Sequence, residues 1–151
     1  MSEDRPGRWF TWAELTGSET AARLKIDNEP GPEERAALRA LVVHVLDPLR
    51  DLLGVPMIVS SGYRCASLNR AIGGTATSQH IYGEAADFHA AGIESEEVVR
   101  RLVASDLPFR QAIYYHPTRG GHVHVSHWAC GPNKRETLYA PESGGYQPWT
   151  R

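Results

Sequence analysis

The sequence predicts one α+β domain built around a small sheet. Hydrophobic residues recur at helical spacing in some segments and form short strand-like runs in others, and the connections between these segments are short. A chain of 151 residues lies within the size range of a single domain, and 41% of its residues are hydrophobic, which suits a core formed without disulfide support. We therefore expect residues 1–151 to form one domain.

Residues 8–54 form the expected helical part of this domain. After a proline- and glycine-containing boundary at residues 30–32, leucines and valines recur at helical spacing over residues 38–53. This pattern predicts the longest amphipathic helix of the chain. Pro48 should kink or split the helix, because proline lacks an N–H donor and crowds the preceding turn. Gly54 should end it.

Residues 56–128 are expected to contain the strands and the functional site. The sequence predicts strands at residues 57–60, 85–88, 112–115 and 122–128, and helices at residues 66–72 and 96–104. Ser95 is a candidate cap for the second of these helices. Residues 129–151 are expected to be a turn-rich C-terminal segment.

The composition argues against several classes of partner. Sixteen basic and 18 acidic residues give a net charge of -2, which offers no electrostatic case for binding nucleic acid or a membrane surface. The N-terminal residues 1–6 are polar and lack the apolar core of a secretory signal, so we expect synthesis in the cytoplasm without a signal peptide. Cys65 and Cys130 are too few for a disulfide scaffold and are expected to be reduced thiols.

Histidines are concentrated in one part of the chain, because six of the seven lie between His80 and His127. Histidine is a common zinc ligand, and a catalytic zinc needs three protein ligands and an open position. Side chains alternate along a strand, so His122 and His124 should share one face while His127 points to the other. A metal site near His122 and His124 is therefore a reasonable hypothesis, with the full ligand set left open by this pattern.

The remaining histidines have simpler explanations. His44 lies inside the predicted long helix and is expected on its surface. His116 precedes a proline in a turn and is expected to face solvent. His89 would share a strand face with Asp87, but a regular strand would hold the two side chains apart along its axis. We therefore expect His89 to be a surface or hydrogen-bonded histidine.

Two motifs and one later strand agree in residue type and spacing with a known family. Residues 61–64 read S-G-Y-R, Asn69 follows, residues 78–87 read S-Q-H-I-Y-G-E-A-A-D, and residues 122–126 read H-V-H-V-S. This set resembles the zinc D-alanyl-D-alanine carboxypeptidases, a family that includes phage L-alanyl-D-glutamate endolysins. The N-terminal part of the chain resembles phage and prophage members. The resemblance implies a hedgehog-like fold, in which a small, mostly antiparallel sheet is flanked by helices.

The resemblance also implies roles for individual residues. It makes His80, Asp87 and His124 the ligands of a zinc ion. It makes Arg64 the residue that pairs with substrate near the metal, where a guanidinium can hold a carboxylate through two parallel hydrogen bonds or stabilise an oxyanion. It places Ser78 beside the site, either holding the loop of His80 or touching substrate.

The general base is the point at which this sequence departs from the family pattern. Many relatives carry an acidic residue three positions before the third ligand, and here that position is Gly121. Peptide hydrolysis needs a group that takes a proton from water and passes it to the leaving amine. We expect His122 to fill this role, because it shares a strand face with His124. Glu84 and His116 are lesser candidates.

These observations predict a zinc-dependent peptidase that hydrolyses peptidoglycan stem peptides. The bond is either D-Ala-D-Ala, as in a carboxypeptidase, or L-Ala-D-Glu, as in an endolysin. The phage-like N-terminal part and the expected lack of a signal peptide favour a phage or prophage lysis or virion protein that acts on the cell wall. We expect it to be a monomer, with no nucleic-acid or membrane partner. The alternative, favoured by Gly121, is a non-catalytic zinc-binding module that serves as a structural or cell-wall-binding part of a phage particle.

Overall fold

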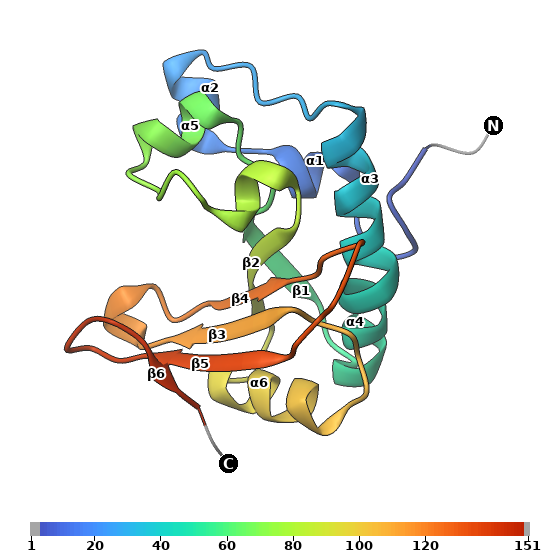
Figure 1. Cartoon of the computed structure of the whole chain (residues 1–151), viewed down its shortest axis with the longest axis vertical. Coiled ribbons are helices and arrows are strands. Elements are labelled where there is room, and N and C mark those ends of the chain that lie inside the picture. Colours follow the sequence, from blue (N-terminus) through green and yellow to red (C-terminus); the bar gives the residue numbers. More distant parts are fainter. Residues whose placement is uncertain (1–3, 150–151) are drawn as a thin grey trace.

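The computed structural model describes residues 4–149, which form one six-stranded sheet packed with helices (Figure 1). The helical elements are α1 (Trp12–Thr16), α2 (Glu19–Leu24), α3 (Pro32–Leu41), η1 (Val42–Leu46), α4 (Asp47–Leu53), α5 (Ala66–Ala71), η2 (Gln79–Tyr82), α6 (Ser95–Ala104) and η3 (Pro117–Arg119). The strands are β1 (Met57–Ser61), β2 (Ala85–Ala90), β3 (Gln111–Tyr115), β4 (Val123–Ser126), β5 (Glu136–Ala140) and β6 (Gln147–Pro148). The predicted α+β class is confirmed.

The long helix predicted from hydrophobic spacing is present, with a π-helical turn directly before Pro48. In η1 the backbone bonds widen, so that the N–H of Asp47 donates to the carbonyl of Val42. The wider turn accommodates a residue that has no N–H and crowds the turn before it. The expected break at Pro48 is therefore a π-helical segment between α3 and α4. Gly54 ends α4 in the left-handed conformation, as predicted.

The strands follow the order β1-β2-β4-β3-β5-β6. All neighbouring pairs are antiparallel except β3 and β5, which run parallel. The mostly antiparallel sheet is thus confirmed. The turn-rich segment predicted at residues 129–151 is corrected here, because residues 136–140 and 147–148 extend the sheet as β5 and β6. A second correction concerns Ser95, which is the first residue of α6, whereas Glu94 occupies the cap position.

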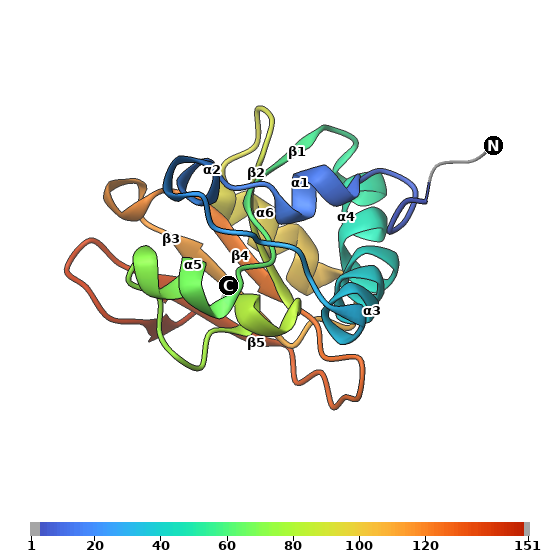
Figure 2. The same cartoon turned by 90° about the horizontal axis from the view of Figure 1, so that it is seen from above.

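The two faces of the sheet have different partners. Val123 and Val125 of β4 and Phe88 of β2 belong to the hydrophobic core, together with the apolar residues of α6. Because side chains alternate along a strand, Asp87 and His124 point to the opposite face. Helix α6 lies on one side of the sheet, and α2, α5 and η2 lie on the other (Figures 1 and 2). The alternation therefore turns the candidate ligands away from the core and toward η2.

Both cysteines, Cys65 and Cys130, are free thiols, as expected. Cys65 also caps α5, because its Sγ accepts a hydrogen bond from the N–H of Leu68. Among the helices of residues 4–149, none is long and apolar enough to cross a membrane.

Candidate metal centre

The loop that carries His80 is held by caps and by close backbone packing. The buried Asn69 donates from Nδ2 to the carbonyl of Thr75 at 2.8 Å. Ser78 caps η2 by accepting a hydrogen bond at Oγ from the N–H of His80 at 3.3 Å. Gly83 ends η2 with φ of 72°, and a Cβ there would lie only 2.5 Å from the backbone oxygen of Glu34. These contacts explain why the motif needs a hydroxyl before His80 and a glycine after it.

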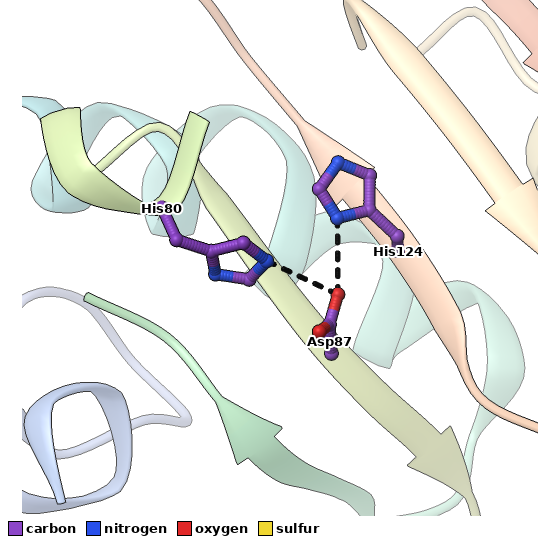
Figure 3. A group of neighbouring side chains, drawn as sticks. All are labelled: His80, Asp87 and His124. Carbon is purple, nitrogen blue, oxygen red and sulfur yellow. Dashed lines mark hydrogen bonds and ion pairs between the residues drawn. The ribbon is translucent and has the colours of Figure 1, made fainter. Parts of the chain in front are cut away.

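His80, Asp87 and His124 converge on one point (Figure 3). Asp87 of β2 lies directly opposite His124 of β4 in the antiparallel register. Asp87 Oδ1 lies 3.3 Å from His80 Nε2 and 3.0 Å from His124 Nδ1. One candidate ligand atom from each residue lies within 4.8 Å of the other two. The structure therefore brings together the three residues that the sequence proposes as ligands.

The donor chemistry of this group fits a zinc ion. His80 Nδ1 lies 2.7 Å from the carbonyl oxygen of Gly62, which can only accept, so Nδ1 carries the hydrogen and donates it. In a neutral imidazole the lone pair of Nε2 then points toward Asp87 Oδ1. Two electron-rich atoms are stable in this arrangement when a cation lies between them. Two imidazoles and one carboxylate form a donor set found in catalytic zinc sites.

The electrostatics of the group also favour a cation. Burial would raise the pKa of the Asp87 carboxyl, but the adjacent rings of His124 and His80 hold it well below its usual range. Burial lowers the pKa of His124, and the neighbouring Asp87 only partly opposes this. An ionised carboxylate beside a neutral imidazole is the protonation state that metal binding requires.

Arg64 and Ser78 lie in the same cleft as the three candidate ligands. Arg64 Nη2 donates to Ser78 Oγ at 3.0 Å, and the backbone N–H of Arg64 donates to the carbonyl of His80 at 3.1 Å. Among the described residues, the buried Arg64 Nε has no hydrogen-bond partner. The guanidinium therefore keeps a donor for a ligand, while Ser78 holds both the arginine and the loop of His80.

His122 also lines the cleft, and the other two base candidates do not. His122 Nε2 lies 3.8 Å from Asp87 Oδ2, and burial lowers the pKa of the His122 ring. Glu84 Oε1 lies 3.9 Å from Arg110 Nη1, and His116 Nδ1 lies 3.6 Å from Glu142 Oε2. Neither Glu84 nor His116 lines the cleft. Of the three candidates, only His122 lines the cleft.

The other histidines lie away from the cleft. His127 is buried on the opposite face of the sheet, where its ring stacks on His44 with 5.2 Å between centroids. His44 is exposed on the surface of η1, as predicted, and His89 is exposed with Nε2 3.2 Å from the carbonyl of Gly120. The alternation argument for His127 is therefore confirmed.

Sequence reasoning missed three side chains that shape the cleft, which has a volume of about 460 Å³. Gln79 contacts His124, and Tyr115 stacks on His122. The hydroxyl oxygens of Tyr146 and Tyr115 lie 3.3 Å apart. Tyr146 comes from the turn between β5 and β6, within the predicted turn-rich segment at residues 129–151. Pairing with β3 brings this turn to the site, and no local signal in the sequence indicates it.

The conformation of Gly121 disfavours a side chain at the position where many relatives carry an acidic residue. Gly121 has φ of 65°, and a Cβ at this position would lie 3.4 Å from the Cα of Pro117. Gly121 lines a neighbouring hollow and is absent from the lining of the metal cleft. Any other residue at position 121 would therefore have a strained backbone, and its Cβ would contact Pro117.

In this α+β fold, two imidazoles and a carboxylate converge at a polar cleft, an arrangement that could hold a metal ion. The comparison with protein families gives the class, because residues 8–126 match the family described as Peptidase M15. The match covers more than half of the chain, and the chain belongs to this family of zinc peptidases. The resemblance noted in the motifs is thereby confirmed. A search among curated proteins gave no match.

Proposed function

We propose that this chain is a zinc-dependent peptidase that hydrolyses the stem peptides of peptidoglycan. The observation that carries the proposal is the convergence of His80, Asp87 and His124 in a cleft that also contains Arg64. When bound by these three residues, zinc would polarise a scissile carbonyl and increase the acidity of water. The protein side chains would bind and orient the peptide and move its protons.

Arg64 would hold a carboxylate of the substrate. Its guanidinium has an unused buried donor at Nε, and Ser78 fixes its orientation through Nη2. A planar guanidinium binds carboxylates through paired hydrogen bonds. Both the terminal carboxylate of D-Ala-D-Ala and a carboxylate of D-Glu are suitable partners, so the proposal covers a carboxypeptidase and an L-Ala-D-Glu endopeptidase.

His122 would act as the general base. It would take a proton from the water that attacks the scissile carbonyl and donate it to the leaving amine. Its position in the cleft, with Nε2 3.8 Å from an oxygen of the proposed ligand Asp87, supports this role. The proposal also includes action as a monomer on the cell wall and a phage or prophage origin.

A second candidate function is a non-catalytic zinc-binding module of a phage particle. The observation that favours it is Gly121, which stands where many relatives carry an acid and whose conformation disfavours a side chain. In this case the three proposed ligands would bind zinc for structural purposes or as part of a wall-binding surface.

The test is to incubate the zinc-loaded protein with purified peptidoglycan and defined stem peptides, beside a His124→Ala control, and to identify products by mass spectrometry. Release of D-alanine would establish a carboxypeptidase, and a cut between L-Ala and D-Glu would establish an endopeptidase. Cleavage that persists in the control would contradict the role of His124. No cleavage by a folded protein with one bound zinc would favour the non-catalytic module.

A further inference from the structure

The side chain of Gln79 contacts the second of the two histidines in the candidate metal centre. Gln79 Oε1 lies 2.8 Å from His124 Nε2, although the two residues are 45 positions apart in the sequence. Gln79 is the first residue of η2 and directly precedes His80. One short segment therefore supplies both a candidate ligand and a contact to another ligand on the far strand.

This contact determines which nitrogen of His124 carries a hydrogen. The amide oxygen of Gln79 can only accept a hydrogen bond, so His124 Nε2 must be the donor. A neutral imidazole has one N–H, which leaves the lone pair on Nδ1. Nδ1 is the ring nitrogen that lies 3.0 Å from Asp87 Oδ1 at the point of convergence. The contact with Gln79 thus leaves the lone pair of Nδ1 facing Asp87.

His80 is oriented in the same way but by a different kind of group. Its Nδ1 donates to the backbone carbonyl of Gly62, and its Nε2 faces Asp87. The two rings therefore present different nitrogens, Nε2 in His80 and Nδ1 in His124. The acceptor for His80 belongs to the backbone, whereas the acceptor for His124 is a side chain and can be replaced by mutation.

We propose that Gln79 is a positioning residue, which fixes the ring of His124 and selects Nδ1 as its metal-binding atom. The inference rests on the proposed zinc site and adds a residue to it. Hydrogen-bond partners of metal-bound histidines hold the ring orientation and the tautomer, and their loss typically lowers metal affinity about 10- to 100-fold. The loop that carries His80 would therefore influence the metal through His124 as well.

The test compares Gln79→Met, which has similar length but no acceptor at its end, with Gln79→Glu, which keeps an oxygen there. Gln147→Met, an exposed residue of β6, makes the same chemical change away from the cleft. Zinc affinity is measured by competition with a chromophoric chelator, after circular dichroism and thermal melting show that each variant is folded. We expect Gln79→Met to lose about 10- to 100-fold in affinity. Gln79→Glu and Gln147→Met should remain close to wild type.

A second readout is the side-chain ¹H–¹⁵N spectrum of the zinc-loaded protein. We expect His124 to be protonated at Nε2 and bound through Nδ1, and His80 to show the reverse pattern. Wild-type affinity in Gln79→Met, or binding of His124 through Nε2, would overturn the inference. Neither readout uses a peptide, so both test the role of Gln79 separately from catalysis. If the protein binds zinc in the way proposed but cleaves no peptide, the peptidase function is refuted and the role of Gln79 stands. A wild type that binds no zinc would overturn both.

Discussion

The ring of Tyr115 stacks on the imidazole of His122, with 4.3 Å between the ring centroids and 23° between the ring planes. The backbone supports this contact, because the N–H of Tyr115 donates to the carbonyl of His122 at 3.0 Å. Tyr115 ends β3 and His122 directly precedes β4, so the contact joins the ends of two paired strands. The stack holds the proposed general base against one wall of the cleft.

Replacing Tyr115 by leucine should therefore lower kcat. An aromatic pair contributes about 0.5–1.5 kcal/mol beyond its buried area, which corresponds to a loss of up to about tenfold if the ring of His122 must be held for catalysis. Tyr115→Phe keeps the stack and should retain most of the activity. Both variants are compared by kcat and KM at saturating zinc. An equal loss in Tyr115→Phe would assign the effect to the hydroxyl and contradict the role of stacking.

Introducing an acid at residue 121 should destabilise the protein without raising its activity. Gly121 has φ of 65°, and this region costs most L-residues about 1–2 kcal/mol. We expect Gly121→Glu to lower the free energy of unfolding by about that amount in urea titrations. Gly121→Asn is the matched control, because asparagine tolerates the left-handed region better and should lose less. Higher turnover in Gly121→Glu would show that the cleft lacks an effective base.

The sequence indicates the candidate ligands because its motifs resemble those of a known family, whereas strand alternation alone leaves the ligand set open. His80 and Asp87 lie in one ten-residue motif, where Gly83 ends a turn before β2, and His124 belongs to an alternating strand. Alternation also separates His124 from His127, as the structure confirms. Spacing along a strand is set by backbone geometry alone, so the separation of His124 from His127 needs no knowledge of distant contacts.

The rest of the site depends on contacts between distant segments. Gln79 meets His124, and Tyr146 reaches the cleft because β5 pairs in parallel with β3. The turn that carries Tyr146 is held by Arg119, whose Nη1 donates to the carbonyls of Pro141 and Gly145 at 3.1 and 2.7 Å. Such pairings are decided by tertiary packing, which a local hydrophobic pattern does not specify.

Arg135 should be a major contributor to stability, because it caps the end of α6. Its guanidinium donates to the carbonyl oxygens of Leu102, Val103, Ser105 and Leu107. Hydrogen bonds from a charged group contribute about 1.5–3 kcal/mol, so we expect Arg135→Ala to lower the free energy of unfolding by at least about 2 kcal/mol. Arg101→Ala removes an exposed ion pair with Glu97 and should cost less than about 1 kcal/mol. Equal losses in chemical denaturation would contradict the capping role.

His127 should make the stability of the fold depend on pH. Its ring is buried, its Nδ1 donates to the carbonyl of Pro108 at 2.7 Å, and it stacks on His44. Burial lowers the pKa of His127, the Pro108 bond partly opposes this, and His44 lowers it further. The folded pKa thus lies below the unfolded value of about 6.5, so the unfolded state binds the proton more readily. The neutral ring stabilises the fold fully above about pH 6.5, and this stability is lost as the pH falls toward the folded pKa.

The measurement is urea unfolding of wild type and His127→Gln between about pH 7.5 and about pH 5.5. A chelator keeps both proteins metal-free, so that proton release by zinc ligands does not enter the comparison. We expect the free energy of unfolding to fall more steeply with decreasing pH in the wild type, because the variant has no group that titrates at this position. His44→Gln should keep most of the steep dependence, since burial is the largest cause of the shift in His127. Equal slopes in wild type and His127→Gln would assign the acid sensitivity to the histidines of the cleft.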